Sequence, residues 1–326
     1  MMTETGYTPT PSKSPASSKV MRWVYIIGAF IVLAAIGGFF NRAFLTPENG
    51  LAILRAAAMS GMVAMGATFI TLSGRFFSLA LGQTAMFAGV LMAVLMSAGL
   101  PFGIAVVLTF AVIILLGALQ GGIIAMGANP IVTTLGAGAI LAGLAGLATG
   151  GKNVPIESAV VEWIGNGRII GVPTQTWAFL FSVAVAWWVI NKTRLGRETI
   201  LMGANRATAE ASGVNVALIT ILVFIIASIA AGMMGIFEAA QFNKARVMGF
   251  DAVDFNVIAA VLIGGTAIQG GRGSPLQSAL GAVFIATVQN YMLLLAWSAG
   301  VRTVITGALI VVIVVGFHIA GKRKGA

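Results

Sequence analysis

Long apolar runs follow one another along most of the chain, and this pattern constrains the fold more than any other feature of the sequence. A helix needs about 20 apolar residues to cross the hydrocarbon core of a bilayer. Only 9% of the 326 residues are charged, whereas a soluble domain carries about 25%. Water would not solvate such a composition, so the sequence predicts an all-α membrane protein.

The length criterion divides the chain into about ten predicted transmembrane helices. The sixth and the eighth runs are shorter than the others. The predicted spans are residues 23–40, 54–73, 76–97, 102–126, 130–149, 176–190, 217–241, 254–265, 275–296 and 302–320.

The chain divides into a single transmembrane domain, residues 21–321, and two cytoplasmic tails. Residues 1–20 are rich in Ser, Thr and Pro and predict a disordered tail, and residues 322–326 form a basic tail. If the N-terminus lies inside, twelve of the 19 Lys and Arg residues fall in cytoplasmic segments and seven outside. The positive-inside rule then places both termini in the cytoplasm, and most acidic residues, including Asp251 and Asp254, outside.

The longest charged segment, residues 191–216, interrupts two apolar runs and lies on the cytoplasmic side in this topology. It contains Lys192, Arg194, Arg197 and Arg206, together with two glutamates. A membrane protein that receives force from a soluble partner needs a docking surface of this kind. We therefore expect this Ala-rich, amphipathic loop to form a helix at the membrane surface and to bind a partner.

Two segments, 73–94 and 243–264, share a pattern. Both pass from polar residues through Gly and Phe into an apolar run of small residues. The first begins inside and the second outside in the predicted topology, as expected for an inverted repeat.

A glycine-rich segment follows the eighth predicted span. Glycine allows positive φ angles and close backbone approach, and irregular backbone persists in a membrane only where protein buries it or water lines it. The segment is interpreted as a cytoplasmic hinge or gate loop, with a simple tight turn as the alternative. Its residues are Gly264, Gly265, Thr266, Gly270, Gly271 and Gly273.

The start of the third predicted span is unusually polar and indicates a break that faces a cavity. Phe76 and Phe77 have rings that can stack on a sugar, although packed or lipid-facing Phe is the default. Intramembrane Ser and Thr often bond only to their own helix. The candidate lining of a passage is Ser78, Gln83, Thr84, Asn129, Thr133, Thr134 and Asn256.

Glu238 lies inside the predicted span 217–241, where a charged side chain is costly. An ion pair with Lys244 or Arg246 would neutralise it, and a role in substrate handling is the alternative. No pair of close carboxylates and no HExxH motif is present, and the phosphate-loop-like stretch 146–152 continues with Asn153 in place of Ser or Thr. The chain also has no cysteine. We therefore expect neither enzymatic activity nor a metal site.

Several of these segments resemble the ribose-type permease family, the membrane subunits of bacterial ABC importers for simple sugars. Residues 201–216 are similar to the family pattern Gly-x-Asn-x-x-Ala-x-x-x-Ser-Gly-Ile-x-Val. Residues 193–197 and 256–273 also match. The resemblance extends over about residues 20–320 and is most specific from 190 to 285.

The resemblance implies a permease in the bacterial inner membrane that pairs with a second permease copy or a homologue. The implied partners are a cytoplasmic ABC ATPase, which would bind ATP and Mg, and an external sugar-binding protein; no directly bound cofactor and no nucleic acid is implied. It also implies a coupling helix from Gly203 to Val214 that docks on the ATPase. Its candidate contact residues are Gly203, Asn205, Arg206, Ala207, Glu210, Ser212 and Gly213.

One departure from the family pattern affects the expected solute. The family usually has Gly-x-Ile-Asp-Leu-Ser-x-Gly at the start of the third span, but here Ser78 replaces the acid and Ala80 the Ser. The expected solute is therefore a monosaccharide or related polyol, not a particular sugar. The alternatives are a branched-chain amino acid permease and an ion-coupled secondary transporter, which would need more buried ionisable groups than Glu238.

Overall fold

The computed structural model describes residues 37, 41–75 and 77–322. The chain forms two units, residues 1–46 and 47–326, which are described separately. In the first unit a short 3-10 helix, η1 (Arg42–Leu45), follows Asn41, whose side chain accepts a hydrogen bond from the Ala43 N–H. The predicted tail 1–20, the first predicted span apart from Gly37, and residues 323–326 lie outside the described residues.

The second unit is a bundle of α-helices with two short antiparallel β-ladders. The ladders pair β1 (Val154–Pro155) with β4 (Lys244–Ala245), and β2 (Arg168–Ile169) with β3 (Val172–Pro173). The helices are α2 (Pro47–Leu72), α3 (Leu81–Ser97), α4 (Phe102–Ala125), α5 (Pro130–Thr149), α6 (Ala159–Asn166), α7 (Thr174–Lys192), α8 (Arg194–Ala204), α9 (Arg206–Ala211), α10 (Val216–Gln241), α11 (Asp251–Ile263), α12 (Pro275–Leu294) and α13 (Ala299–Lys322).

The prediction of an all-α membrane protein is confirmed. Among the described residues, α2, α4, α5 and α10 are long and apolar enough to cross a membrane, and α3 and α13 contain shorter apolar stretches. Each predicted span from 54–73 onward falls on a helix of the bundle. The largest differences in their boundaries are at α2, which begins at Pro47 rather than at residue 54, and at α3.

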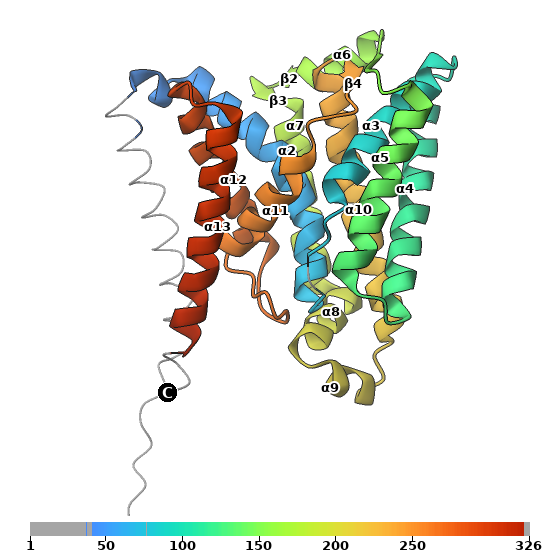
Figure 1. Cartoon of the computed structure of the whole chain (residues 1–326), viewed down its shortest axis with the longest axis vertical. Coiled ribbons are helices and arrows are strands. Elements are labelled where there is room, and N and C mark those ends of the chain that lie inside the picture. Colours follow the sequence, from blue (N-terminus) through green and yellow to red (C-terminus); the bar gives the residue numbers. More distant parts are fainter. Residues whose placement is uncertain (1–36, 38–40, 76, 323–326) are drawn as a thin grey trace, which may run out of the picture. The chain divides into compact units, whose positions relative to one another are not determined.

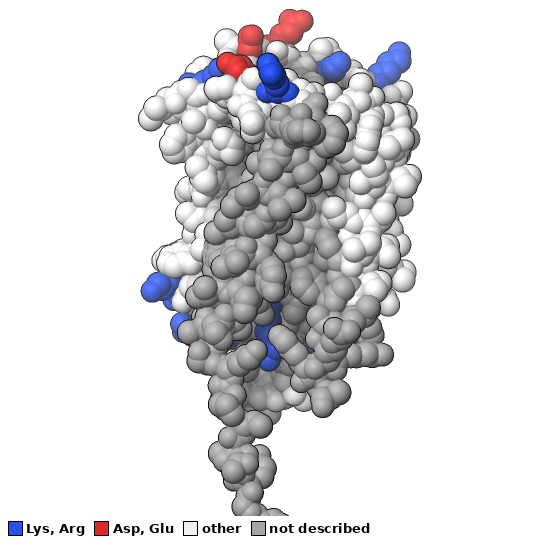
Figure 2. Space-filling view, turned by 90° about the vertical axis from the view of Figure 1, so that its left-hand side faces the viewer, with Lys and Arg blue, Asp and Glu red and all other residues white. Residues whose placement is uncertain are grey.

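The two ends of the bundle differ in character (Figure 1). One end carries α6 and the β-ladders, and the other carries α8 and α9; they are called the α6 end and the α9 end below. On the face seen in Figure 2, the acidic side chains gather at the α6 end, and the described surface between the two ends shows no charged side chain. The exposed side chains of α4 and α5, such as Leu115 and Leu147, are apolar. This uncharged belt is the surface that faces the bilayer.

Helix α10 is the centre of the bundle and packs against α2, α3 and α4. Small residues allow the backbones to approach closely. A Cβ atom at Gly235 would overlap the carbonyl of Ala85 on α3, one at Gly66 would lie 2.6 Å from Cα of Ala227, and one at Gly121 would lie 2.7 Å from Cα of Ile221. These three glycines therefore let neighbouring helices of the chain pack closely.

The third predicted span begins five residues too early, because residues 77–80 are not helical. Helix α2 ends at Leu72, the chain turns at Gly74, whose φ is +74°, and α3 begins only at Leu81. Two side chains accept hydrogen bonds from this irregular backbone: Thr134 from the Leu79 N–H at 3.1 Å, and Ser78 from the Ala80 N–H at 3.3 Å. Polar residues that looked like a passage lining therefore hold a non-helical segment together. Phe76 is not among the described residues.

Helix α11 repeats this arrangement in the opposite direction. It has 13 residues and is about 20 Å long, less than the hydrocarbon thickness of about 30 Å. It follows a largely irregular segment after α10, and its N-terminus meets that of α3. Asp254 accepts a hydrogen bond from the Gly82 N–H at 3.0 Å, and Gln83 donates to Asp251 at 3.2 Å. The carboxylates lie where they stabilise helix N-termini.

Asp251 and Asp254 therefore do not belong to an external loop, as the predicted topology placed them. They lie in the first turn of α11, against α3. This position was not predicted, because the eighth predicted span begins at residue 254. An acidic residue next to a short apolar run looks like the end of a loop, although it is here in the first turn of a short helix.

Candidate functional sites

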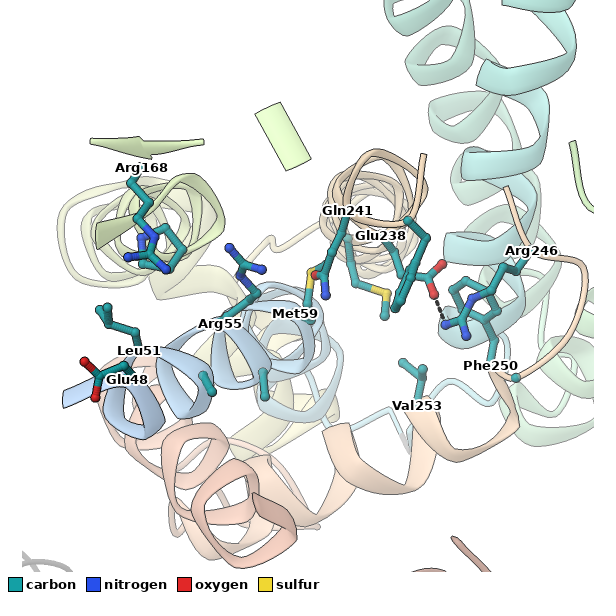
Figure 3. Close-up of a pocket in the computed structure, with 16 residues that line it drawn as sticks. Glu48, Leu51, Arg55, Met59, Arg168, Glu238, Gln241, Arg246, Phe250 and Val253 are labelled. Atoms are coloured by element: carbon teal, nitrogen blue, oxygen red, sulfur yellow. Dashed lines mark hydrogen bonds and ion pairs between the residues drawn. The ribbon is translucent and has the colours of Figure 1, made fainter. Parts of the chain in front are cut away.

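A cavity of about 490 Å³ opens near the α6 end of the bundle. It lies between α2, α10, β2 and the segment from β4 to α11 (Figure 3). Pockets of about 300–1,000 Å³ are typical of small-molecule sites. Its lining residues are Glu48, Leu51, Ala52, Arg55, Ala56, Met59, Arg168, Pro173, Met234, Glu238, Gln241, Phe242, Arg246, Gly249, Phe250 and Val253.

Planar polar groups enter this cavity from several elements. Arg55 projects from α2 and Arg168 from β2, while Gln241 and Glu238 come from α10 (Figure 3). Amide, carboxylate and guanidinium groups can hydrogen-bond to hydroxyl groups as donors or acceptors. The cavity therefore has the chemistry of a site for a polyhydroxylated solute.

Glu238 and Arg246 form an ion pair at one side of the cavity (Figure 3). The predicted pairing of Glu238 is thus confirmed, with Arg246 as the partner. The Arg246 guanidinium also lies 4.4 Å from the centre of the Phe242 ring. The Glu238 side chain is only 7% exposed, so a nearby cation is needed to keep its charge.

Two smaller cavities lie farther along the bundle, on either side of the start of α11. One, of about 280 Å³, contains Gln83 and Asp251; the other, of about 330 Å³, contains Asn256 and Arg302. Of the predicted passage residues, Gln83 and Asn256 are the two that line a cavity. Thr84 instead donates to the Ala80 carbonyl, Asn129 caps α5, and Phe77 packs against the buried core.

The gate loop, residues 264–274, is compact. The φ angles of Gly265, Gly270 and Gly271 are +80°, +90° and +68°, which explains the glycines because other L-residues rarely adopt them. The buried Thr266 hydroxyl lies 3.3 Å from that of Ser278 on α12. The loop is more than a simple turn, because it also contacts two other elements.

These contacts form a junction of four glycines, Gly74, Gly203, Gly270 and Gly271, at the α9 end. The Gly271 N–H donates to the Leu72 carbonyl, at the end of α2, at 2.9 Å. A Cβ atom at Gly203, in the last turn of α8, would overlap that carbonyl and lie 2.6 Å from the Gly271 nitrogen. Three segments far apart in sequence therefore touch backbone to backbone. Sequence reasoning named three of these glycines but did not bring them together.

The segment 191–216 forms two short helices, α8 and α9, and α9 lies within the predicted coupling helix, Gly203 to Val214. Asn205 is extended and separates α8 from α9, and its side chain accepts a hydrogen bond from the Thr208 N–H at 3.0 Å. Ion pairs Arg194–Glu198 and Arg206–Glu210 lie on the exposed surface. Ala207 and Ser212 belong to the same projecting unit, and Gly213 adopts the φ of +79° that ends it.

Arg75 connects this surface to the bundle. Its guanidinium donates to the Thr220 hydroxyl of α10 at 3.3 Å. Burial lowers the pKa of Arg75, the nearby Arg206 lowers it further, and Glu210 raises it. Helix α9 is therefore close enough to the end of α2 to interact electrostatically with it.

Comparison with known proteins places these features in a family. Residues 49–314 match the family of the branched-chain amino acid transport system / permease component. The chain belongs to this family of transport permeases. The match covers the bundle from α2 into α13 and so includes the glycine junction and every residue that lines the three cavities except Glu48.

Curated relatives match over nearly their whole length. A probable ABC transporter permease, YphD of Escherichia coli, is 32% identical and covers 97% of each chain. The ribose import permease RbsC of Haemophilus influenzae is 28% identical over 91% of this chain and 93% of its own. The L-arabinose transport permease AraH of E. coli is 28% identical over 96% of each. No solved structure gave a significant match.

Proposed function

We propose that this chain is the membrane subunit of an ABC importer that moves a monosaccharide or related polyol into the cytoplasm. The observation that carries the proposal is the combination of a polyol-sized cavity with planar polar groups at the α6 end and a projecting helical surface at the α9 end. The relatives that transport ribose and arabinose support sugar over amino acid as the solute.

In this proposal the α9 end faces the cytoplasm. The described cations at that end, Arg75, Lys192, Arg194, Arg197, Arg206 and Arg272, are accompanied by two glutamates, while acidic residues concentrate toward the α6 end. Together with the basic residues of the two tails, this distribution follows the positive-inside rule. The chain then crosses the inner membrane ten times, with the predicted span 23–40 as the first crossing and both termini in the cytoplasm.

The proposed topology contains an inverted repeat. Helix α2, its irregular return and α3 form one unit; α10, its irregular return and α11 form the other. The two units run in opposite directions and meet at the N-termini of their short helices. Such repeats, with broken helices at their interface, are a common architecture of membrane transporters.

The energy source in this proposal is a separate cytoplasmic ATPase. Helices α8 and α9 would dock on it, with Asn205, Arg206 and Glu210 at the surface. Closure of the ATPases on ATP would push α8, and the glycine junction would pass the displacement to the gate loop and to the end of α2. A second permease copy or a homologue would complete the passage, and an external binding protein would deliver the solute to the α6 end.

The test is purification of the protein from its own host in mild detergent, mass spectrometry of bound proteins, and uptake assays with ¹⁴C-labelled D-ribose, L-arabinose and L-leucine. A co-purifying ATPase and uptake of a sugar that stops on ATP depletion are expected. Uptake of leucine alone would move the assignment to the amino acid class. Uptake that collapses with an ionophore but survives ATP depletion would replace the ABC proposal with a secondary transporter.

A further inference from the structure

Phe255 lies in the first half of α11, and its aromatic ring is the shared wall of the two smaller cavities. The residue is 54% exposed, although its neighbours in α11 pack into the bundle. Both cavities are lined mainly by apolar residues, with a few polar side chains among them, and Phe255 lies between them. In this it differs from the exposed aliphatic side chains of α4 and α5. It provides an apolar face with hydrogen-bonding groups on both sides.

The first of these cavities is rich in hydrogen-bond acceptors. Gln83 donates its amide to Asp251, which leaves its own carbonyl oxygen without a partner among the described residues. Asp251 is exposed, while Asp254 is occupied by the Gly82 N–H. A ligand in this cavity would find the Gln83 carbonyl oxygen and the Asp251 carboxylate ready to accept hydrogen bonds.

The second cavity offers hydrogen-bond donors. The Gln289 amide donates to Asn256 at 2.7 Å and to Thr306 at 3.4 Å, so the amide hydrogens of Asn256 have no protein acceptor in this network. The Nε atom of Arg302 is buried and has no partner among the described residues. A buried guanidinium nitrogen of this kind can donate a hydrogen bond to a hydroxyl oxygen of a ligand.

A ring-shaped polyol can use either set of groups. Each hydroxyl both donates and accepts hydrogen bonds, and the C–H face of a sugar ring is apolar and packs on an aromatic ring. The carboxylates of Asp251 and Asp254 outnumber the guanidinium of Arg302, so the local charge disfavours an anionic solute. The chemistry therefore selects a neutral sugar over a sugar acid or sugar phosphate.

We propose that Phe255 is the platform of a solute-binding station, with Gln83 and Asp251 on one side and Asn256 and Arg302 on the other. The station binds one neutral monosaccharide at a time, against one face of the Phe255 ring or the other. This inference rests on the proposed transport function and adds the residues that select the solute. Nothing in the sequence pattern pointed to Phe255, because one Phe in an apolar run looks like a lipid-facing residue.

The absence of cysteine from the chain makes a direct test possible. Phe255→Cys and Thr303→Cys are introduced singly into the complete importer in its own membrane, and a membrane-impermeant, charged methanethiosulfonate is added from outside. The control is Phe181→Cys on α7, an exposed aromatic position that lines none of the three cavities. Thr303 lines the second of the smaller cavities. We expect Phe255→Cys and Thr303→Cys to react faster than Phe181→Cys, and D-ribose or L-arabinose, but not D-galacturonate, to slow their reaction.

Reaction of Phe255→Cys at the rate of the control would overturn the station, and so would fast reaction that neither sugar slows.

A second measurement uses the Michaelis constant for uptake. Phe255→Leu should raise it about fivefold, the loss expected for one aromatic contact, and Phe255→Trp should restore it. An unchanged Michaelis constant in Phe255→Leu would contradict the proposal. Sugar uptake by the unaltered importer is measured separately, so failure of the transport function and failure of the station give different signals.

Discussion

At the scale of single residues, the two buried acidic side chains among the described residues are stabilised in different ways. Glu238 is nearly fully buried and paired with Arg246, while Asp254 accepts a hydrogen bond from the N-terminus of α3. Removing one partner of a buried ion pair leaves an uncompensated charge, whereas removing both can be nearly neutral. The Glu238–Arg246 pair is therefore testable by comparing single and double variants.

Arg246→Met should lower the stability of the protein by about 2 kcal/mol, below the usual range for a fully buried pair because the Arg246 side chain is 36% exposed. The double variant Glu238→Gln with Arg246→Met should recover most of that loss. Thermal unfolding in detergent measures both, with Arg55→Met, which removes an arginine of the same cavity that has no ion pair among the described residues, as the control. A double variant that is less stable than Arg246→Met would contradict this account.

The pairing of Glu238 was predictable because a carboxylate in an apolar run needs a nearby cation and the next loop supplies two. The roles of Ser78 and Thr134 were not. Their spacing is compatible with a passage lining, but in the structure they accept hydrogen bonds from the irregular backbone before α3. A sequence does not reveal which polar side chains will hydrogen-bond to backbone groups, because that depends on which elements come together.

At the scale of elements, helix breaks determine what each segment can do. The apolar runs predicted the positions of the long helices, because membrane-length hydrophobicity depends on local composition. The shorter helices α3 and α11 were harder to place, because the segments before them, 73–80 and 242–250, mix polar and apolar residues. Likewise, the division of 191–216 into α8 and α9 depends on one extended residue, Asn205.

Asn205→Ala should destabilise α9 by about 1 kcal/mol, because it removes the acceptor for the Thr208 N–H at the start of that helix. We expect weaker binding of the ATPase and slower uptake, with Asn205→Asp restoring both. The measurements are co-purification of the ATPase and the initial rate of uptake. Full activity of Asn205→Ala, especially in combination with Gly213→Trp, would mean that this segment is not the docking surface.

Gly203→Ala should abolish uptake and lower the thermal stability, because the added methyl group would overlap the Leu72 carbonyl. The matched control is Gly146→Ala in α5, where a Cβ atom meets nothing within 4 Å. That change should be neutral or stabilise the protein by up to about 1 kcal/mol, as expected for Gly to Ala within a helix. Normal uptake by Gly203→Ala would show that the close contact between α8 and α2 is not needed.

At the scale of the whole molecule, the proposed orientation of the bundle explains why its two ends differ. One end has a cavity that accepts a solute, and the other has a projecting surface for a protein partner. The resemblance in sequence predicted both partners, but the location of the cavities depends on the long-range packing of α10 and α11 and was not accessible from local patterns.

Single cysteines at the two ends test the orientation. Met248 follows β4 at the α6 end, and Met126 follows α4 at the α9 end; both are strongly exposed. In intact cells, an impermeant thiol reagent should label Met248→Cys, while Met126→Cys should react only after the membrane is permeabilised. The opposite pattern would invert the proposed topology and assign the α6 end to the cytoplasm.

The glycine junction has a mechanical consequence. Where side chains separate two elements, changes of rotamer absorb small displacements, so one element can shift slightly without moving the other. At Gly74, Gly203, Gly270 and Gly271 no side chain lies between the backbones, so no such slack exists. A displacement of α8 by even a fraction of an ångström must move the loop 264–274 and the end of α2 by a similar amount. The contact between these backbones is stiff because no side chains separate them. For the same reason, it has no room for a larger residue at these positions.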